Sequence, residues 1–225
     1  MTAVLLAVHV LAAIVFIGPV TVAASLFPRY ARQGEVGVAR VLHRISRVYA
    51  VLGVAVPVFG IATAAQMGVL GDAWLLVSLA LTLVAALLLA VEVLPGQTRV
   101  LAALTGDAAP VVPSRRAMST GVFALIWAVV VVLMIVRPGS DDGGGRVITG
   151  LRVAAVVEAA TLVALLLNLV TVHWRPVTAL GGPLHGTAYL AVIAVVLLLP
   201  GAPRAAKLLA LVPGIGGWLA LRALP

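Results

Sequence analysis

The chain has 225 residues, of which 63% are hydrophobic and 10% are charged, and its formal net charge is +8. A soluble domain of this length could not hide so much apolar surface from water, so the composition excludes one. The basic residues flank apolar stretches and form no separate basic domain, which favours membrane lipids over nucleic acid as partners. The chain has no cysteine, which excludes disulfides, thiolate metal sites and covalently attached haem.

Seven long apolar stretches follow one another, each near the roughly 20 residues that cross a bilayer as a helix. Because the stretches are continuous and do not alternate, we expect an all-α, polytopic transmembrane bundle. The predicted spans are 3–26, 48–67, 73–94, 118–136, 148–172, 184–199 and 206–221. Pro213, Gly214, Gly216 and Gly217 interrupt the last stretch, and its alternative is a re-entrant or surface segment.

The basic residues predict the orientation, because arginine and lysine accumulate on the cytoplasmic side of membranes. With the N-terminus outside, ten of them lie inside: Arg29, Arg32, Arg40, Arg44, Arg47, Arg99, Arg115, Arg116, Arg175 and Arg222. Five then lie outside: Arg137, Arg146, Arg152, Arg204 and Lys207. This distribution favours N-out and C-in. The preference for arginine, alanine, valine and leucine is typical of a GC-rich bacterial genome, which indicates the bacterial inner membrane.

A domain boundary is expected at 138–147, where glycine and aspartate are concentrated, as in flexible linkers. It divides a four-helix transmembrane unit, 1–137, from a three-helix unit, 148–225. In the long connection before the fourth span, residues 100–104 are expected to lie along the membrane surface. Pro19 and Pro57 lie within predicted spans and should kink them.

Glu158 is the most informative single residue, because it lies near the centre of the fifth span. A carboxylate at that depth costs about 2.5–3.5 kcal/mol on insertion scales, so Glu158 should face the bundle interior. It should be either protonated or paired with a cation. One interpretation is a proton, cation or ligand site, and the other is a structural carboxyl bonded to a neighbouring helix. Thr161, Asn168, Ser78 and Thr82 are the polar residues that could join it.

Glu92 lies at the end of the third span and is a second candidate, although Arg99 or Arg47 could simply pair with it. The four histidines suggest metal or haem binding, since imidazole binds iron, copper and zinc. The predicted depths place His9 on the opposite side from His43, His173 and His185. Those three could meet at the inner surface, but none has a close motif spacing such as HxxxH, so the sequence predicts no metal site and no resident cofactor.

Two groups of residues are similar to known families. Leu151-Arg152, Glu158, the step Leu184-His185-Gly186 and the Pro213-Gly214 break occur together in the last third of the chain. This segment resembles a small three-helix integral membrane domain of unknown function from actinobacteria. The resemblance implies that Arg152, Glu158, His185 and Gly186 matter, and it implies no activity.

His9 and Gly18 in the first span, followed by Pro28, form the second group. With them the first four spans resemble copper-resistance-type and haem-binding bacterial membrane proteins. In the haem-binding relatives a first-span histidine is a ligand, so the resemblance makes His9 the haem or copper candidate.

We therefore expect a non-enzymatic accessory or assembly component, or a small carrier that uses Glu158, with Arg152, His185 and Glu92 as further candidate binding residues. Its expected partners are membrane lipids and other membrane proteins. The alternatives are a haem- or copper-binding redox protein, or an enzyme acting on a lipid or isoprenoid with Glu158 as general acid. The sequence leaves open whether the protein is an enzyme.

Overall fold

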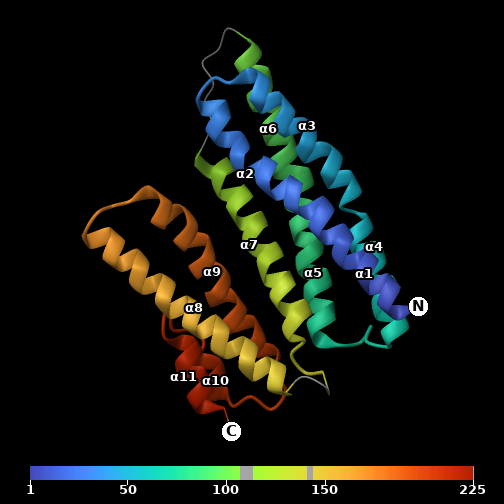
Figure 1. Ribbon diagram of the computed structural model, residues 1–225, viewed down its shortest axis with the longest axis vertical. Helices are drawn as coiled ribbons and strands as arrows, with labels where there is room; N and C mark the ends of the chain where they lie inside the picture. The colour runs from blue at the N-terminus through green and yellow to red at the C-terminus, as the bar shows by residue number, and fades with distance from the viewer. Residues whose placement is uncertain (107–113, 141–143, 225) are drawn as a thin grey trace. The chain divides into compact units, whose positions relative to one another are not determined.

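The computed structural model of the protein describes residues 1–106, 114–140 and 144–224. Every regular element in these residues is a helix, which confirms the all-α prediction (Figure 1). Six helices are long and apolar enough to cross a membrane: Thr2–Arg32, Val36–Met67, Ala73–Thr105, Ser119–Val136, Gly145–Val170 and Arg175–Leu198. Asp141 and Asp142 of the predicted linker lie outside the described residues, as do the side chains of Arg115 and Arg116.

The stretch predicted as a seventh span, 206–221, contains two short helices in place of one long one. These are α10 (Arg204–Leu209) and α11 (Gly216–Ala223), of six and eight residues. Each is far shorter than the roughly 20 residues that a crossing helix needs. Pro213 has no N–H to continue a helix, and Gly214 takes φ +85°, a left-handed conformation that favours glycine.

Contacts divide the chain into two compact units. Unit 1 comprises residues 1–70 and 79–124, and unit 2 comprises residues 71–78 and 125–225. The predicted domains, 1–137 and 148–225 with a linker at 138–147, stay a prediction.

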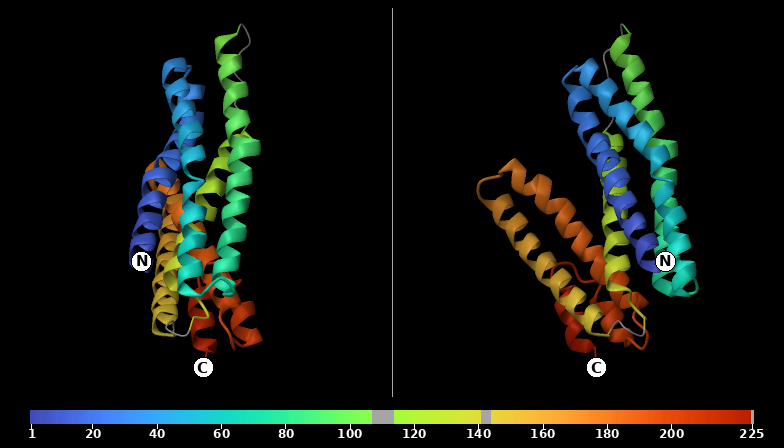
Figure 2. Two further views of the ribbon diagram at one scale, coloured as in Figure 1. Left: turned by 90° about the vertical axis from the view of Figure 1, so that its right-hand side faces the viewer. Right: turned by 45° about the vertical axis from the view of Figure 1, so that its right-hand side comes forward.

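Unit 1 is built from long helices interrupted by irregular turns. The first consists of α1 (Thr2–Ala12), a π-helical turn η1 (Ala13–Ile17) and α2 (Gly18–Arg32). After a short connection, α3 (Val36–Leu52) and α4 (Ala55–Met67) run back alongside it (Figure 2). The third consists of α5 (Ala73–Leu88), η2 (Leu89–Val93) and α6 (Leu94–Thr105), and α7 (Ser114–Val136) begins in this unit.

Three prolines account for the irregular turns. Proline clashes with the carbonyl four residues earlier, and a widened or broken turn relieves the clash. The residue four before Pro19 lies in η1, and the residue four before Pro95 lies in η2. For Pro57 that residue is Gly53, where α3 ends. The sequence predicted kinks at Pro19 and Pro57.

The helices of unit 1 are longer than a bilayer requires, because one end has a core of its own. There α2, α3 and α6 pack around Ala23, Phe27, Ala31, Ala39, Leu42 and Val100. Six exposed arginines surround this core: Arg29, Arg32, Arg40, Arg44, Arg47 and Arg99. Since Val100 is only 3% exposed and α6 continues η2, the expectation that residues 100–104 lie along the membrane surface is wrong. Val100 lies in this helix-packing core, and Leu101 and Leu104 pack against it.

Unit 2 is built around the antiparallel pair α8 (Gly144–Val170) and α9 (Arg175–Leu198), which lie side by side (Figure 1). The helical hairpin α10–α11 packs on this pair, and its turn at residues 210–215 is called the hairpin tip below. The close approach needs small residues: an added Cβ on Gly217 would lie 2.5 Å from the Cβ of Ala155. The shared core comprises Val136, Val147, Leu151, Val192, Val195, Val196, Ala206, Ala210 and Ala220.

Candidate functional site

Glu158 lies at the middle of α8, as the sequence predicted. It follows the first residue of this 27-residue helix by 14 positions, or about 21 Å at 1.5 Å per residue. Its side chain is 0% exposed and therefore faces protein. Because the side chain is fully buried, the carboxyl contacts neither lipid nor bulk water and must have its partners within the protein.

The partner of Glu158 is the backbone of the hairpin tip. The N–H of Gly214 donates a hydrogen bond to Oε1 of Glu158 across 2.6 Å, and the two residues are 56 positions apart in the chain. Gly214 comes close because it has no side chain: an added Cβ would overlap Leu162 of α8. The carboxyl thus satisfies a buried backbone donor that the break in the helix leaves without an intrahelical partner.

A second hydrogen bond holds the same hairpin tip to α9. The hydroxyl of Tyr189 donates to the carbonyl of Leu211 across 2.7 Å. Tyr189 lies one turn after His185, and their rings stack with centroids 6.4 Å apart. One backbone donor and one backbone acceptor of the tip are therefore satisfied by side chains of two different long helices.

His185 contacts the backbone of Glu158 and not its carboxyl. Nδ1 of His185 lies 3.1 Å from the carbonyl oxygen of Glu158 and 3.3 Å from the hydroxyl of Thr161. Since a carbonyl only accepts, Nδ1 is the protonated nitrogen in this contact. Thr161 donates back to the carbonyls of Val157 and Glu158, so its hydroxyl serves its own helix.

The other oxygen of Glu158, Oε2, is buried and has no hydrogen-bond partner among the described residues. In the protonated form it would carry a donor, and in the ionised form a charge. Both forms favour a partner when they are buried. The arrangement is therefore half satisfied: one oxygen bonds the hairpin tip, and the other has no partner among the described residues.

The remaining residues proposed to join Glu158 lie elsewhere. Arg152 is exposed on α8, six residues before Glu158. Asn168 lies ten residues after Glu158, about 15 Å along the helix, and bonds the α8–α9 connection. The hydroxyl of Ser78 donates to the carbonyl of Trp74 in α5. Thus the structure brings His185 and Thr161 close to Glu158 but not Arg152 or Asn168.

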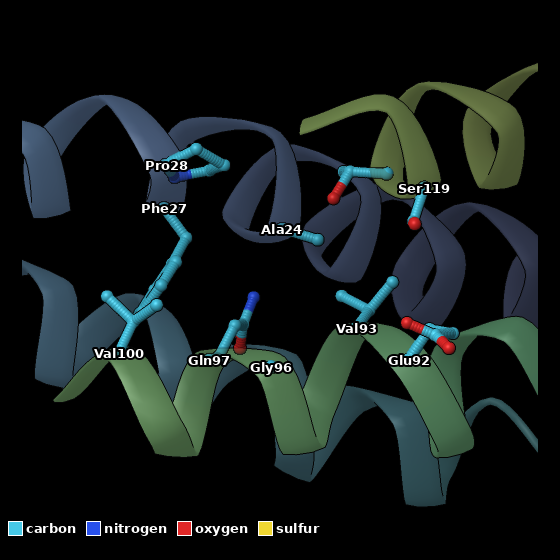
Figure 3. Close-up of a pocket in the computed structure, with 10 residues that line it drawn as sticks. Ala24, Phe27, Pro28, Glu92, Val93, Gly96, Gln97, Val100 and Ser119 are labelled. Carbon is cyan, nitrogen blue, oxygen red and sulfur yellow. The ribbon is translucent and has the colours of Figure 1, made fainter. Parts of the chain in front are cut away.

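Glu92 lies in η2 of unit 1 and borders a small cavity. Glu92 and Ser119 of α7 face each other across it, and the Gln97 amide points into it (Figure 3). The cavity measures about 20 Å³, which holds about one water molecule. Within the described residues neither Arg47 nor Arg99 forms an ion pair with Glu92.

A buried polar group beside this cavity was not anticipated. Gln97 is 4% exposed, accepts a hydrogen bond from Nδ1 of His43 at 3.0 Å, and lies 3.4 Å from the Ser46 hydroxyl. It joins α6 to α3 across more than 50 residues of sequence. Residues this far apart in the chain form no local sequence motif that would predict the contact. The sequence signal that was present is a glutamine within an apolar helix.

His9, the haem or copper candidate, joins α1 to α4. Its Nδ1 donates to the carbonyl of Val56 at 2.9 Å, and an added Cβ on Gly60 would lie 2.9 Å from its Cε1. The ring therefore packs on Gly60 and bonds a peptide group. Within the described residues, no three His, Asp or Glu side chains converge as a metal ligand set.

Comparison of the chain with protein-family models, curated proteins and solved structures gave no match. The two resemblances inferred from the sequence therefore stay predictions.

The contact between Glu158 and Gly214 predicts different effects of two substitutions. Glu158→Gln keeps an acceptor oxygen, so the melting temperature Tm in detergent should stay near that of the parent. Glu158→Leu leaves the N–H of Gly214 buried and unpaired, which should cost about 1–3 kcal/mol of unfolding free energy. For a chain of this size, Tm should fall by on the order of 2–10 °C.

Arg152→Gln is the matched control on the same helix, since its side chain is exposed. Equal Tm values for the Gln and Leu variants of Glu158 would show that the hydrogen bond does not stabilise the fold.

Proposed function

We propose that this chain is a non-enzymatic accessory or assembly component of the bacterial inner membrane, in which Glu158 holds the C-terminal hairpin in place. One observation carries the proposal: the carboxyl is fully buried and bonds the backbone of the hairpin tip. A residue engaged in this way supports a fold that other membrane components or lipids recognise.

The surroundings of Glu158 favour this proposal over a carrier. A carrier needs polar groups along a path, whereas Thr161 and His185 both bond backbone carbonyls of α8. Asn168 is occupied by the α8–α9 connection, about 15 Å away along the helix. The described polar groups thus serve helix packing.

A proton-coupled carrier is the second candidate, and Oε2 of Glu158 favours it. Carboxyl groups buried within membrane-spanning helices are the groups that proton carriers use, and this one has an oxygen without a partner among the described residues. On this hypothesis the hairpin would move as Glu158 changes charge, because the same carboxyl bonds its tip. The haem or copper protein that uses His9, and the lipid or isoprenoid enzyme, stay hypotheses from the sequence.

Proton flux separates the two candidates. We expect liposomes containing the purified protein to dissipate an imposed pH gradient no faster than protein-free liposomes, with the same result for Glu158→Gln. The measurement uses a trapped pH-sensitive dye. Flux above the protein-free rate that disappears in Glu158→Gln, but persists in Arg152→Gln, would contradict the accessory role and support the carrier.

The proposed topology has six crossings with the N-terminus outside. Relative to the sequence-based count, a re-entrant hairpin moves Arg222 from the inner to the outer side. Nine basic residues then lie inside and six outside, which still favours N-out. Both termini consequently lie outside, whereas a seventh crossing would place the C-terminus inside.

Single cysteines in this cysteine-free chain test the topology. In right-side-out vesicles, an impermeant maleimide should label Ala3→Cys and Leu224→Cys but not Gln33→Cys until detergent is added. Protection of Leu224→Cys together with labelling of Ala3→Cys would indicate seven crossings and contradict the re-entrant hairpin.

A further inference from the structure

An open depression of about 640 Å³ lies where the end of α8 meets the start of α9. Its apolar wall is formed by Leu165, Leu169 and Ala179. Its basic rim is formed by His173 and Arg175, both exposed. The volume is within the range of pockets that hold small molecules or parts of larger ones. The combination of an apolar wall and a basic rim indicates an amphiphilic, anionic ligand.

The polar side chains in the depression are already engaged by the protein. Oδ1 of Asn168 accepts the N–H of Trp174 at 2.8 Å. Its Nδ2 donates to the Thr178 hydroxyl at 3.1 Å and to the Trp174 carbonyl at 3.2 Å. Asn168 therefore holds the α8–α9 connection in place, and His173 and Arg175 remain as the groups that can meet a ligand.

Among the described residues that line the depression, none has an acidic side chain to neutralise the rim. Glu158 is the nearest acid along α8, ten residues before Asn168, and it is buried against the hairpin. An arginine without a counter-ion attracts an anion, and a phosphate suits the fork of its guanidinium. His173 offers an N–H donor beside it in either ring form.

The proposed membrane embedding puts the depression at the depth of lipid headgroups. It opens at the turn between two helices that are long and apolar enough to cross a membrane. Trp174, beside Arg175, is 62% exposed, as is typical of tryptophan at membrane interfaces. Leu169 is 61% exposed, so the apolar wall continues onto the exposed surface of α8.

We propose that this depression binds an anionic phospholipid. Its phosphate lies between Arg175 and His173, and one acyl chain runs along Leu165, Leu169 and Ala179. The inference rests on the membrane embedding proposed above and not on the hydrogen bond of Glu158 to the hairpin tip. It adds a specific lipid site to the general contacts that any membrane protein makes.

Native mass spectrometry of the full chain in detergent tests the site, with phosphatidylglycerol and phosphatidylcholine of identical acyl chains as probes. The parent should bind phosphatidylglycerol at least fivefold more tightly than phosphatidylcholine. One basic residue near an anionic lipid is worth about fivefold in affinity, so Arg175→Gln should remove about that much of the preference. Ala179→Phe fills the apolar wall and should weaken binding of both lipids.

Arg152→Gln is the matched control, because it removes an exposed arginine of α8 away from the depression and should leave the preference unchanged. Glu158→Gln should also bind lipid normally, which separates this test from that of the proposed function. Equal binding of the two lipids to the parent, or equal losses in Arg175→Gln and Arg152→Gln, would overturn the proposal. Competition by soluble glycerophosphoglycerol as strong as that of the intact lipid would also overturn it, because the site would then bind free phosphate esters.

Discussion

Backbone groups buried in an apolar environment must find partners, and the hairpin tip is where this constraint acts most strongly. Regular helices satisfy their own backbone, whereas two backbone groups of the turn at 210–215 bond side chains of other helices. Glu158 accepts from the N–H of Gly214, and Tyr189 donates to the carbonyl of Leu211. Leaving a buried N–H unpaired costs about 1–3 kcal/mol. The carboxyl in the middle of α8 therefore supplies the acceptor for a backbone N–H that lies in another part of the chain.

The same constraint limits what Glu158 can do chemically. A side chain that holds the hairpin tip cannot leave it without exposing the N–H of Gly214. Proton exchange at Oε2 would thus be coupled to the position of α10 and α11. A structural role is the simpler account, since His185 and Thr161 are turned to the backbone of α8. In unit 1, a buried polar side chain is likewise hydrogen-bonded to a neighbouring helix, because Gln97 of α6 bonds His43 and Ser46 of α3.

Apolar length predicted the long helices well, because a crossing helix needs little more than a continuous hydrophobic run. Helix ends were less predictable. The helix predicted to begin at residue 48 begins earlier, at Val36. The added residues, 36–47, carry exposed arginines, but they also place Ala39 and Leu42 in a buried core. Likewise Val100 lies in that core. Hydropathy cannot distinguish an apolar residue facing lipid from one facing another helix.

The candidate site was predictable only in part. Glu158 stood out because a carboxyl in a long apolar run is costly wherever it lies. The partner of Glu158 could not be predicted, because every residue except proline has a backbone N–H and Gly214 is 56 residues away in the chain. The Pro213-Gly214 pair did signal an interrupted helix, and the interruption is what supplies that N–H. Arg152 was grouped with Glu158 from a resemblance, yet six residues along a helix place them on different faces.

Hydrogen exchange of the hairpin tip tests the central claim most directly. In detergent-solubilised protein, amides of 210–217 should exchange slowly in the parent and in Glu158→Gln. In Glu158→Leu the same amides should exchange at least tenfold faster, while those of α8 keep their protection. Rapid exchange of 210–217 in the parent, or unchanged exchange in Glu158→Leu, would show that the carboxyl does not hold the hairpin.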